Sequence, residues 1–402
     1  MMNIAVAQSG GPTCVINASL LGVFRAAVES GAVARVYGSE NGIEGILHDR
    51  LVDLNERLGD AHSQRLLRQT PGAALGSCRS KLPAPNGDPT IYERIAARFH
   101  QYNIGAFFYI GGNDSMDTAA KLSVYFRDHA VPVRVIGVPK TIDNDLMHTD
   151  HTPGFGSAAK YLAVTMQEII RDSSAYNTRS VTIVEVMGRH AGWLTASCCV
   201  LRELGERAPH LFYLPEGTFS TARFLQDVRE MQQRYRAVIV AVSEGVTPTD
   251  GDGGYRSGAT DVFGHQYLSG IGKYLEHMVQ TEIGCKVRSI ELNVMQRCSA
   301  HVAAETDLVE AEQIGGAAVR AALAGETGRM MAFRRVSDEP YRVEIDSVDA
   351  GCVANGERCF PKEWITPAQN DVTDDAIPYF RPLIQGEPTL LLRGGLPDMW
   401  KL

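Results

Sequence analysis

Six short apolar segments of the chain each end in a loop that carries glycine, a carboxylate or a basic residue, and longer amphipathic segments separate them. This alternation predicts an α/β fold in β-α-β-α order with mostly parallel sheets. Because the carboxyl ends of parallel strands meet at one edge of a sheet, the loops are expected to gather there. The predicted strands are residues 3–7, 106–110, 131–138, 181–186, 211–214 and 237–242.

The remaining elements follow from the same kind of pattern. Helices are predicted at about residues 17–30, from 157 onward, at 269–283 and at 301–324, and a further strand at 286–294. Residues 247–261 are rich in Gly, Asp, Thr and Ser and are expected to form a surface loop. After residue 325 the alternation ends. Residues 341–348 are expected to form an exposed strand, and the tail is expected to pack on the core away from the chemistry.

Length, charge and cysteine content limit the possible classes of protein. At 402 residues the chain is too long for one ordinary core, which predicts two lobes. A formal net charge of -8 argues against nucleic acid as a partner, and the apolar runs are too short to span a membrane. The eight cysteines form no CxxC pair and the N-terminus carries no export signature, so a reduced, cytoplasmic location is expected.

The segment from Val138 to Asp145, with the sequence VPKTIDND, follows the third predicted strand. It places Asp143 and Asp145 two residues apart on a short loop, where one carboxylate can take a proton while the other orients a neighbour or holds a cation. Lys140 beside them suits an anionic substrate. The alternative is a plain turn whose Thr, Asp and Asn side chains bond back to the backbone.

Two glycine-rich turns lie between a predicted strand and a predicted helix. Gly10 and Gly11 let the backbone approach a phosphate, and the sequence GGNDS at 111–115 repeats the arrangement with a carboxylate and a hydroxyl added. Neither matches GxGxxG or the Walker motif, and each alone is consistent with a simple turn. Together they indicate a polyphosphate donor, for which Lys140 and Arg79 would supply compensating charge.

The second half of the chain also offers charged residues. A glutamate there suits sugar hydroxyls and arginines suit a terminal phosphate, although each taken singly is typical of a solvated surface. These residues are Arg189, Glu244, Arg288 and Arg297. The pair His148 and His151 has the look of a metal site, but no further ligand in the sequence supports it.

The loops together resemble the phosphofructokinase family over about residues 3–325. The motifs SGGPTxxxNAS, LGSCR, GGNDS, PKTIDNDL, TDHTPGFGSA, VEVMGRHAGWL, SEG and QR occur in the family's order and spacing. The resemblance implies two Rossmann-like lobes with the active site between them, and phosphoryl transfer to the 1-hydroxyl of fructose 6-phosphate. It also implies Mg²⁺ as cofactor and a homodimer or homotetramer, because some phosphate-binding arginines of homologues come from a neighbouring subunit; Arg179 is a candidate.

The resemblance assigns lobes and residue roles by position. Residues 1–152, completed by about 298–325, correspond to a donor-binding lobe, 153–297 to a sugar-phosphate-binding lobe, and 326–402 to a C-terminal extension. Asp143 is the base that accepts the proton of the sugar hydroxyl. The other catalytic residues are Asp114, Lys140, Thr141 and Asp145. The donor-binding residues are Gly10, Gly11, Arg79, Gly112 and Ser115. The substrate-binding residues are Thr141, Ile142, Asp143, Met187, Gly188, Arg189, Glu244, Arg288, Val294 and Arg297. The metal-binding residues are Asn113 and Asp114.

Two departures from the family's ATP-using members indicate the donor. Those members resemble GGDGS and PGTIDND, whereas this chain has Asp114 and Lys140 where glycines would lie. The carboxylate would crowd and repel an α-phosphate, and the ammonium would meet the leaving phosphate of a short donor, so pyrophosphate is expected. Asn113 replaces the aspartate associated with magnesium, so the metal is expected to rely on Asp114, the donor or water.

Other departures leave alternatives open. Val294 replaces a larger residue, which leaves sedoheptulose 7-phosphate open as a further substrate, and Leu21 replaces an effector-binding arginine, so weak allostery is expected. The rival functions are an ATP-dependent enzyme, a non-catalytic regulatory subunit and a nicotinamide-dependent dehydrogenase. The intact Thr141, Asp143 and Asp145 argue against the second, and the missing GxGxxG against the third.

Overall fold

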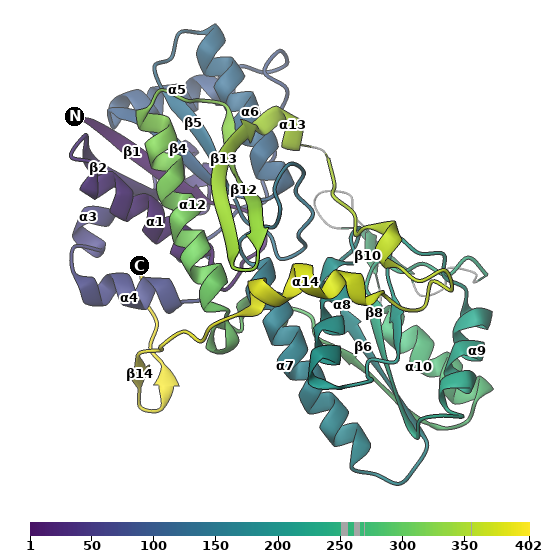
Figure 1. Ribbon diagram of the computed structural model, residues 1–402. Coiled ribbons are helices and arrows are strands. Elements are labelled where there is room, and N and C mark those ends of the chain that lie inside the picture. Colours follow the sequence, from purple (N-terminus) through teal and green to yellow (C-terminus); the bar gives the residue numbers. More distant parts are fainter. Residues whose placement is uncertain (251–255, 261–265, 269, 355) are drawn as a thin grey trace.

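The computed structural model describes residues 1–250, 256–260, 266–268, 270–354 and 356–402, which form two lobes (Figure 1). The larger sheet has the order β13-β12-β5-β4-β1-β2-β3. Its strands are β1 (Met2–Gln8), β2 (Val33–Ser39), β3 (Leu51–Asp53), β4 (Ile104–Gly111), β5 (Arg134–Pro139), β12 (Arg329–Asp338) and β13 (Tyr341–Asp349). Strands β2, β1, β4, β5 and β12 run parallel, with β3 and β13 antiparallel at the edges.

The smaller sheet is parallel and has the order β11-β6-β8-β7. Its strands are β6 (Ser180–Val186), β7 (Leu211–Tyr213), β8 (Ala237–Ser243) and β11 (Lys286–Glu291). Two short antiparallel pairs stand apart from both sheets: β9 (Arg256–Thr260) with β10 (Gln266–Leu268), and β14 (Leu392–Arg393) with β15 (Leu396–Pro397). The predicted α/β class with mostly parallel sheets is confirmed.

Helices cover both faces of each sheet, so the central strands are buried on both sides and their sequences are almost continuously apolar. In the larger lobe α1 and α12 pack on one face and α5 and α6 on the other. The helices of this lobe are α1 (Ile16–Glu29), α2 (Ile43–Leu47), α3 (Leu54–Arg57), α4 (Ala61–Gln69), α5 (Thr90–Gln101), α6 (Asn113–Asp128), α12 (Glu305–Leu323) and α13 (Ala350–Val353). The remaining helices are α7 (Phe155–Ser174), α8 (Trp193–Ser197), α9 (Thr221–Met231), α10 (Ile271–Glu282), α11 (Met295–Cys298) and α14 (Ile377–Phe380).

Helix α12 contacts the start of α7 and packs along α1. The buried carboxylate of Asp307 on α12 accepts the backbone N–H groups of Gly154 at 2.9 Å and Ser157 at 2.8 Å, which satisfies the free donors at the start of α7. A Cβ at Gly22 of α1 would overlap the carbonyl oxygen of Glu312 on α12. Glycine at this position therefore allows the two helices to approach closely.

Several element boundaries differ from those predicted. The strand expected at 286–294 ends at Glu291, and residues Met295–Cys298 turn into α11. The helix expected from 301 begins at Glu305, after a single 3-10 turn at Ala300–Val302. Within the loop expected at 247–261, Arg256–Thr260 form strand β9 instead, and residues 251–255 and 261 lie outside the described residues, as does the first residue of the helix expected at 269–283.

The C-terminal residues do not form a separate appendage. Strand β12 pairs with β5 inside the larger sheet, and the chain then crosses to the second lobe, where Phe360 and Phe380 join the core around Trp193. It returns to the first lobe and buries Trp400 there. The prediction that this tail lies away from the chemistry is wrong, because Glu357 lines the central pocket.

Candidate active site

A pocket between the lobes is lined by the loops that follow β1, β4, β5, β6 and β8, as the strand pattern predicted. Its lining includes most of the residues predicted from the sequence. They are Gly10, Gly11, Arg79, Gly112, Asn113, Asp114, Ser115, Lys140, Thr141, Ile142, Asp143, Asp145, Met187, Arg189, Glu244 and Arg297. Further residues of the lining that the sequence did not single out include Ser9, Thr13, Cys78, Ser80 and Glu357.

Asp143 has the environment of a general base. Its Oδ1 atom is buried and has no hydrogen-bond partner within the described chain, so it is available to a ligand. Burial raises the pKa of Asp143 to about 7, the negative charges of Asp145 and Glu244 add to this, and Arg297 and Lys140 oppose it. A carboxylate whose pKa lies near neutral pH can both accept and release a proton under physiological conditions.

The neighbours of Asp143 hold its loop in place. Its backbone N–H donates to the Oγ1 atom of Thr141 at 3.1 Å. Ile142 is buried in the core of the second lobe, which anchors the loop across the lobe boundary. Burial also raises the pKa of Asp145, and the charge of Glu357 acts in the same direction. Because the charge of Asp145 raises the pKa of Asp143, protonation of Asp145 makes ionisation of Asp143 easier.

Lys140 connects the acidic loop to the glycine turn after β1. Its Nζ donates to the carbonyl oxygen of Gly11 at 2.6 Å, and its side chain is almost completely buried. Burial lowers the pKa of Lys140 to about 8, against the opposing charges of Asp143 and Asp145. A Cβ on Gly10 would lie 3.2 Å from this Nζ, so the glycine leaves room for the ammonium group.

The first turn of α6 lines the pocket near the glycine turn after β1. The helix begins at Asn113, so its free backbone N–H groups and positive dipole end face the pocket. The Oδ1 atom of Asn113 is buried without a partner among the described residues. Asp114 is half exposed and pairs with the Nζ of Lys81 at 2.9 Å. The ammonium of Lys81 partly neutralises the charge of Asp114, the carboxylate that was expected to repel the α-phosphate of a longer donor.

Charged side chains of the opposite wall of the pocket come from separate loops. The buried Nε of Arg297 has no partner within the described chain, and a Cβ on Gly11 would lie 3.0 Å from its guanidinium. Burial raises the pKa of Glu244, while the charges of Arg189 and Arg297 oppose the increase. A Cβ on Gly245 would overlap the carbonyl of Arg189, so the loops after β6 and β8 pack directly on each other.

Three predicted substrate contacts lie outside the described lining of this pocket. Arg288 on β11 is at the surface, where it pairs with Asp172 at 3.1 Å. Val294 is 55% exposed. Gly188, with φ of +131°, forms the bend between Met187 and Arg189, which do line the pocket.

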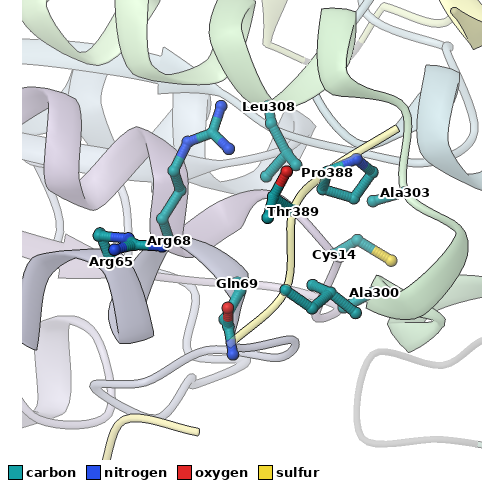
Figure 2. Close-up of a pocket in the computed structure, with 10 residues that line it drawn as sticks. Cys14, Arg65, Arg68, Gln69, Ala300, Ala303, Leu308, Pro388 and Thr389 are labelled. Carbon is teal, nitrogen blue, oxygen red and sulfur yellow. The ribbon is translucent and has the colours of Figure 1, made fainter. Parts of the chain in front are cut away.

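A second cavity lies behind the β1 turn, lined by Cys14 and Arg68 among others (Figure 2). The Arg68 guanidinium is bound by Glu305 at 2.7 Å and by Glu312, which neutralise its charge. The Cys14 thiol donates to the carbonyl oxygen of Arg297 at 3.5 Å, and burial raises its pKa. The Cys14 contact supports the backbone of Arg297 from the side away from the central pocket.

The fold and the site define a class: an α/β enzyme that moves a phosphoryl group between two small anions held in the cleft of two lobes. The chain belongs to the phosphofructokinase family, whose model, described as phosphofructokinase, matches residues 3–322. It is 42% identical to the pyrophosphate–fructose 6-phosphate 1-phosphotransferase of Xanthomonas campestris pv. campestris, covering 98% of this chain and 94% of that protein.

Other relatives agree over the full length. The enzyme of the same name from Halomonas elongata is 39% identical, covering 100% of this chain and 96% of its own. The crystal structure of pyrophosphate-dependent phosphofructokinase from Nitrosospira multiformis superposes with a TM-score of 0.87 at 36% identity, covering 99% of this chain and 95% of that one. Among the described helices, none is both long enough and apolar enough to cross a lipid bilayer.

Proposed function

We propose that this enzyme transfers a phosphoryl group from pyrophosphate to the 1-hydroxyl of fructose 6-phosphate, giving fructose 1,6-bisphosphate and phosphate, reversibly. The observation that carries the proposal is the buried Lys140 ammonium against the carbonyl of Gly11. A cation fixed at the donor turn stabilises the charge that develops on a departing phosphate. The names of the full-length relatives support the same donor and acceptor.

Each side of the pocket has a distinct task in this proposal. Asp143 accepts the proton of the sugar hydroxyl as that oxygen attacks the donor phosphorus. Arg297 and Arg189 bind the sugar phosphate, and Glu244 accepts hydrogen bonds from sugar hydroxyls. The start of α6 and the β1 turn hold the diphosphate through backbone N–H groups.

Magnesium fits the oxygen atoms that the donor side offers. The unpartnered Oδ1 of Asn113 and the half-exposed carboxylate of Asp114 are hard oxygen donors of the kind that Mg²⁺ binds together with phosphates and water. We assign Asn113 and Asp114 to hold it. When bound, the ion would neutralise the charge of the diphosphate and so favour its alignment with the sugar.

Assembly and location belong to the same proposal. Val294 and Met295, each 55% exposed beside Arg297, present apolar surface that a second copy of the chain would cover in a homodimer or homotetramer. Static light scattering on the purified enzyme tests this. The eight free thiols are consistent with a reduced, cytoplasmic location.

The direct test of the function is turnover of fructose 6-phosphate with pyrophosphate and, separately, with ATP. We expect activity with pyrophosphate and little with ATP. Asp143→Ser should fold and lose about 10²- to 10⁴-fold in turnover, the usual value of general-base help. Preference for ATP would contradict the donor assignment, and near-normal activity of Asp143→Ser would contradict the assignment of the base.

A further inference from the structure

Arg358 joins the acidic loop to the second lobe through its main chain. It lies in the segment of the tail that crosses between the lobes, next to Glu357 in the pocket wall. Its backbone N–H donates to the carbonyl oxygen of Asp145 at 2.7 Å. Its own carbonyl accepts the indole N–H of Trp193 at 2.9 Å. The main chain of Arg358 therefore contacts both the acidic loop, at Asp145, and the second lobe, at Trp193.

The guanidinium of Arg358 bonds mainly to backbone carbonyls of the same loop. It donates to the carbonyl oxygens of Thr149 at 2.8 Å and Asn144 at 3.1 Å, and also to that of Asp150. On its other side the group lies over the ring of Trp193, with 4.5 Å between the guanidinium carbon and the ring centroid. The residues it binds form the continuation of the segment that carries Asp143 and Asp145.

The backbone held by Arg358 has an uncommon conformation at Asn144, the residue between Asp143 and Asp145. Asn144, between them, is completely buried and has φ of +56°, a left-handed conformation that is uncommon outside glycine and that asparagine adopts more readily than most other residues. Its side chain donates to the hydroxyl of Tyr379 at 2.8 Å. Asp143 Oδ1 has no hydrogen-bond partner among the described residues, so no hydrogen bond to that oxygen fixes the carboxylate, and the course of the backbone at Asn144 contributes to its direction.

We propose that Arg358 is a positioning residue, which holds the loop at Asn144 in the geometry that aims Asp143 into the pocket and couples this loop to Trp193 of the second lobe. The proposal rests on the proposed function in so far as Asp143 is the base. An arginine suits this task because its planar group offers five N–H donors in fixed directions and stacks on an aromatic face. Lysine has fewer donors and no plane.

The test compares Arg358→Ala and Arg358→Lys with the matched control Arg381→Ala. Arg381 belongs to the same tail, but its guanidinium pairs with the exposed carboxylates of Glu203 and Glu339. Because a displacement of about 1 Å at a reacting group costs about 100-fold in rate, we expect kcat of Arg358→Ala to fall by about 10- to 100-fold. The KM values for both substrates should stay within threefold, Arg358→Lys should lose less, and Arg381→Ala should match wild type within twofold.

Chemical rescue separates positioning from a general loss of structure. Guanidinium ion at tens of millimolar should raise kcat of Arg358→Ala several-fold and leave Arg381→Ala unchanged. If Arg358→Ala does not fold, Tyr379→Phe provides the second measurement. That variant keeps the ring but removes a hydroxyl that accepts from Asn144 and donates to the carbonyl of Asp150 at 2.6 Å, and it should lower kcat in the same way.

All variants are assayed with whichever donor, pyrophosphate or ATP, the wild-type enzyme uses, so an error in the donor assignment leaves this test intact. A folded Arg358→Ala with kcat within twofold of wild type would overturn the proposal. So would a loss that falls entirely on KM, or, when Arg358→Ala does not fold, an unchanged kcat in Tyr379→Phe.

Discussion

The raised pKa of Asp143 predicts a specific acid limb in the rate of the enzyme. With a pKa of about 7, about half of Asp143 is ionised at neutral pH and only about a tenth one pH unit lower, so kcat/KM should fall about fivefold between neutral pH and about pH 6. An aspartate with its ordinary pKa of about 3.9 would leave the rate flat across this range. The structure attributes the shift first to burial and then to the charge of Asp145.

Removal of the charge of Asp145 tests whether that charge raises the pKa of Asp143. Asp145→Asn should move the acid limb toward lower pH by about one unit, the usual effect of a nearby like charge. The height of the profile will also change, so the position of the limb is the quantity to compare. Asp114→Asn is the control, because it removes a carboxylate from the same pocket that is not among the main influences on Asp143.

The assay records initial rates at low fructose 6-phosphate and saturating donor from about pH 5.5 to 8.5, the range that brackets the shifted pKa. The phosphates of the substrates titrate in every enzyme alike, so a difference between variants belongs to the protein. A flat wild-type profile would refute the assignment of Asp143 as a base with a raised pKa. A limb that stays in place in Asp145→Asn would refute the electrostatic explanation of the shift.

Further predictions concern the donor, the pH dependence of stability and the helix packing. The double variant Asp114→Gly with Lys140→Gly should admit ATP and lose pyrophosphate activity; unchanged donor preference in parallel assays would contradict the donor argument. In His151 the charges of Glu310 and Asp150 outweigh the effect of burial and raise the pKa to about 9, so its contribution to stability is complete below about pH 6.5 and disappears as pH rises through about 9. His151→Gln should therefore flatten the decline in free energy of unfolding over this range, as measured by urea titration, and an unchanged slope would exclude His151 as its source. Gly22→Ala should lower the free energy of unfolding by about 1–3 kcal/mol, because the new Cβ overlaps backbone of α12; a melting temperature equal to wild type would show that the helices separate without cost.

The strands and most of the pocket were predictable because their signals are local. An apolar run such as Ala106 to Ile110, followed by glycine and polar residues, indicates both a buried strand and the loop that ends it. Parallel pairing then brings these loops together without further information. Arg288 and Val294 lie on the surface of the fold, because the charge of Arg288 does not indicate which way its side chain faces and Val294 was assigned through the resemblance alone.

The path of the tail was not predictable because its contacts connect residues far apart in the sequence. Arg358 meets Asn144 and Trp193 across separations of more than a hundred residues, and no periodicity marks such a contact. A sequence such as GERCF has no recognised motif, so neither Glu357 nor Arg358 stood out. Long-range contacts of single charged residues are the part of a site that pattern analysis misses.

The surroundings of Asp114 and Lys140 indicate that Lys140 has the larger effect on the choice of donor. Two unit charges at about 4 Å interact by about 4 kcal/mol at an effective dielectric of about 20, and a fully charged Asp114 would repel the α-phosphate of a longer donor by this amount. Asp114 is paired with Lys81 and half exposed, so solvent and its partner reduce that repulsion. Lys140 is buried and fixed against the β1 turn, where its charge is less screened. In the proposed function, selectivity for a short donor is therefore expected to depend chiefly on the space that Lys140 fills and on the charge it brings to the departing phosphate.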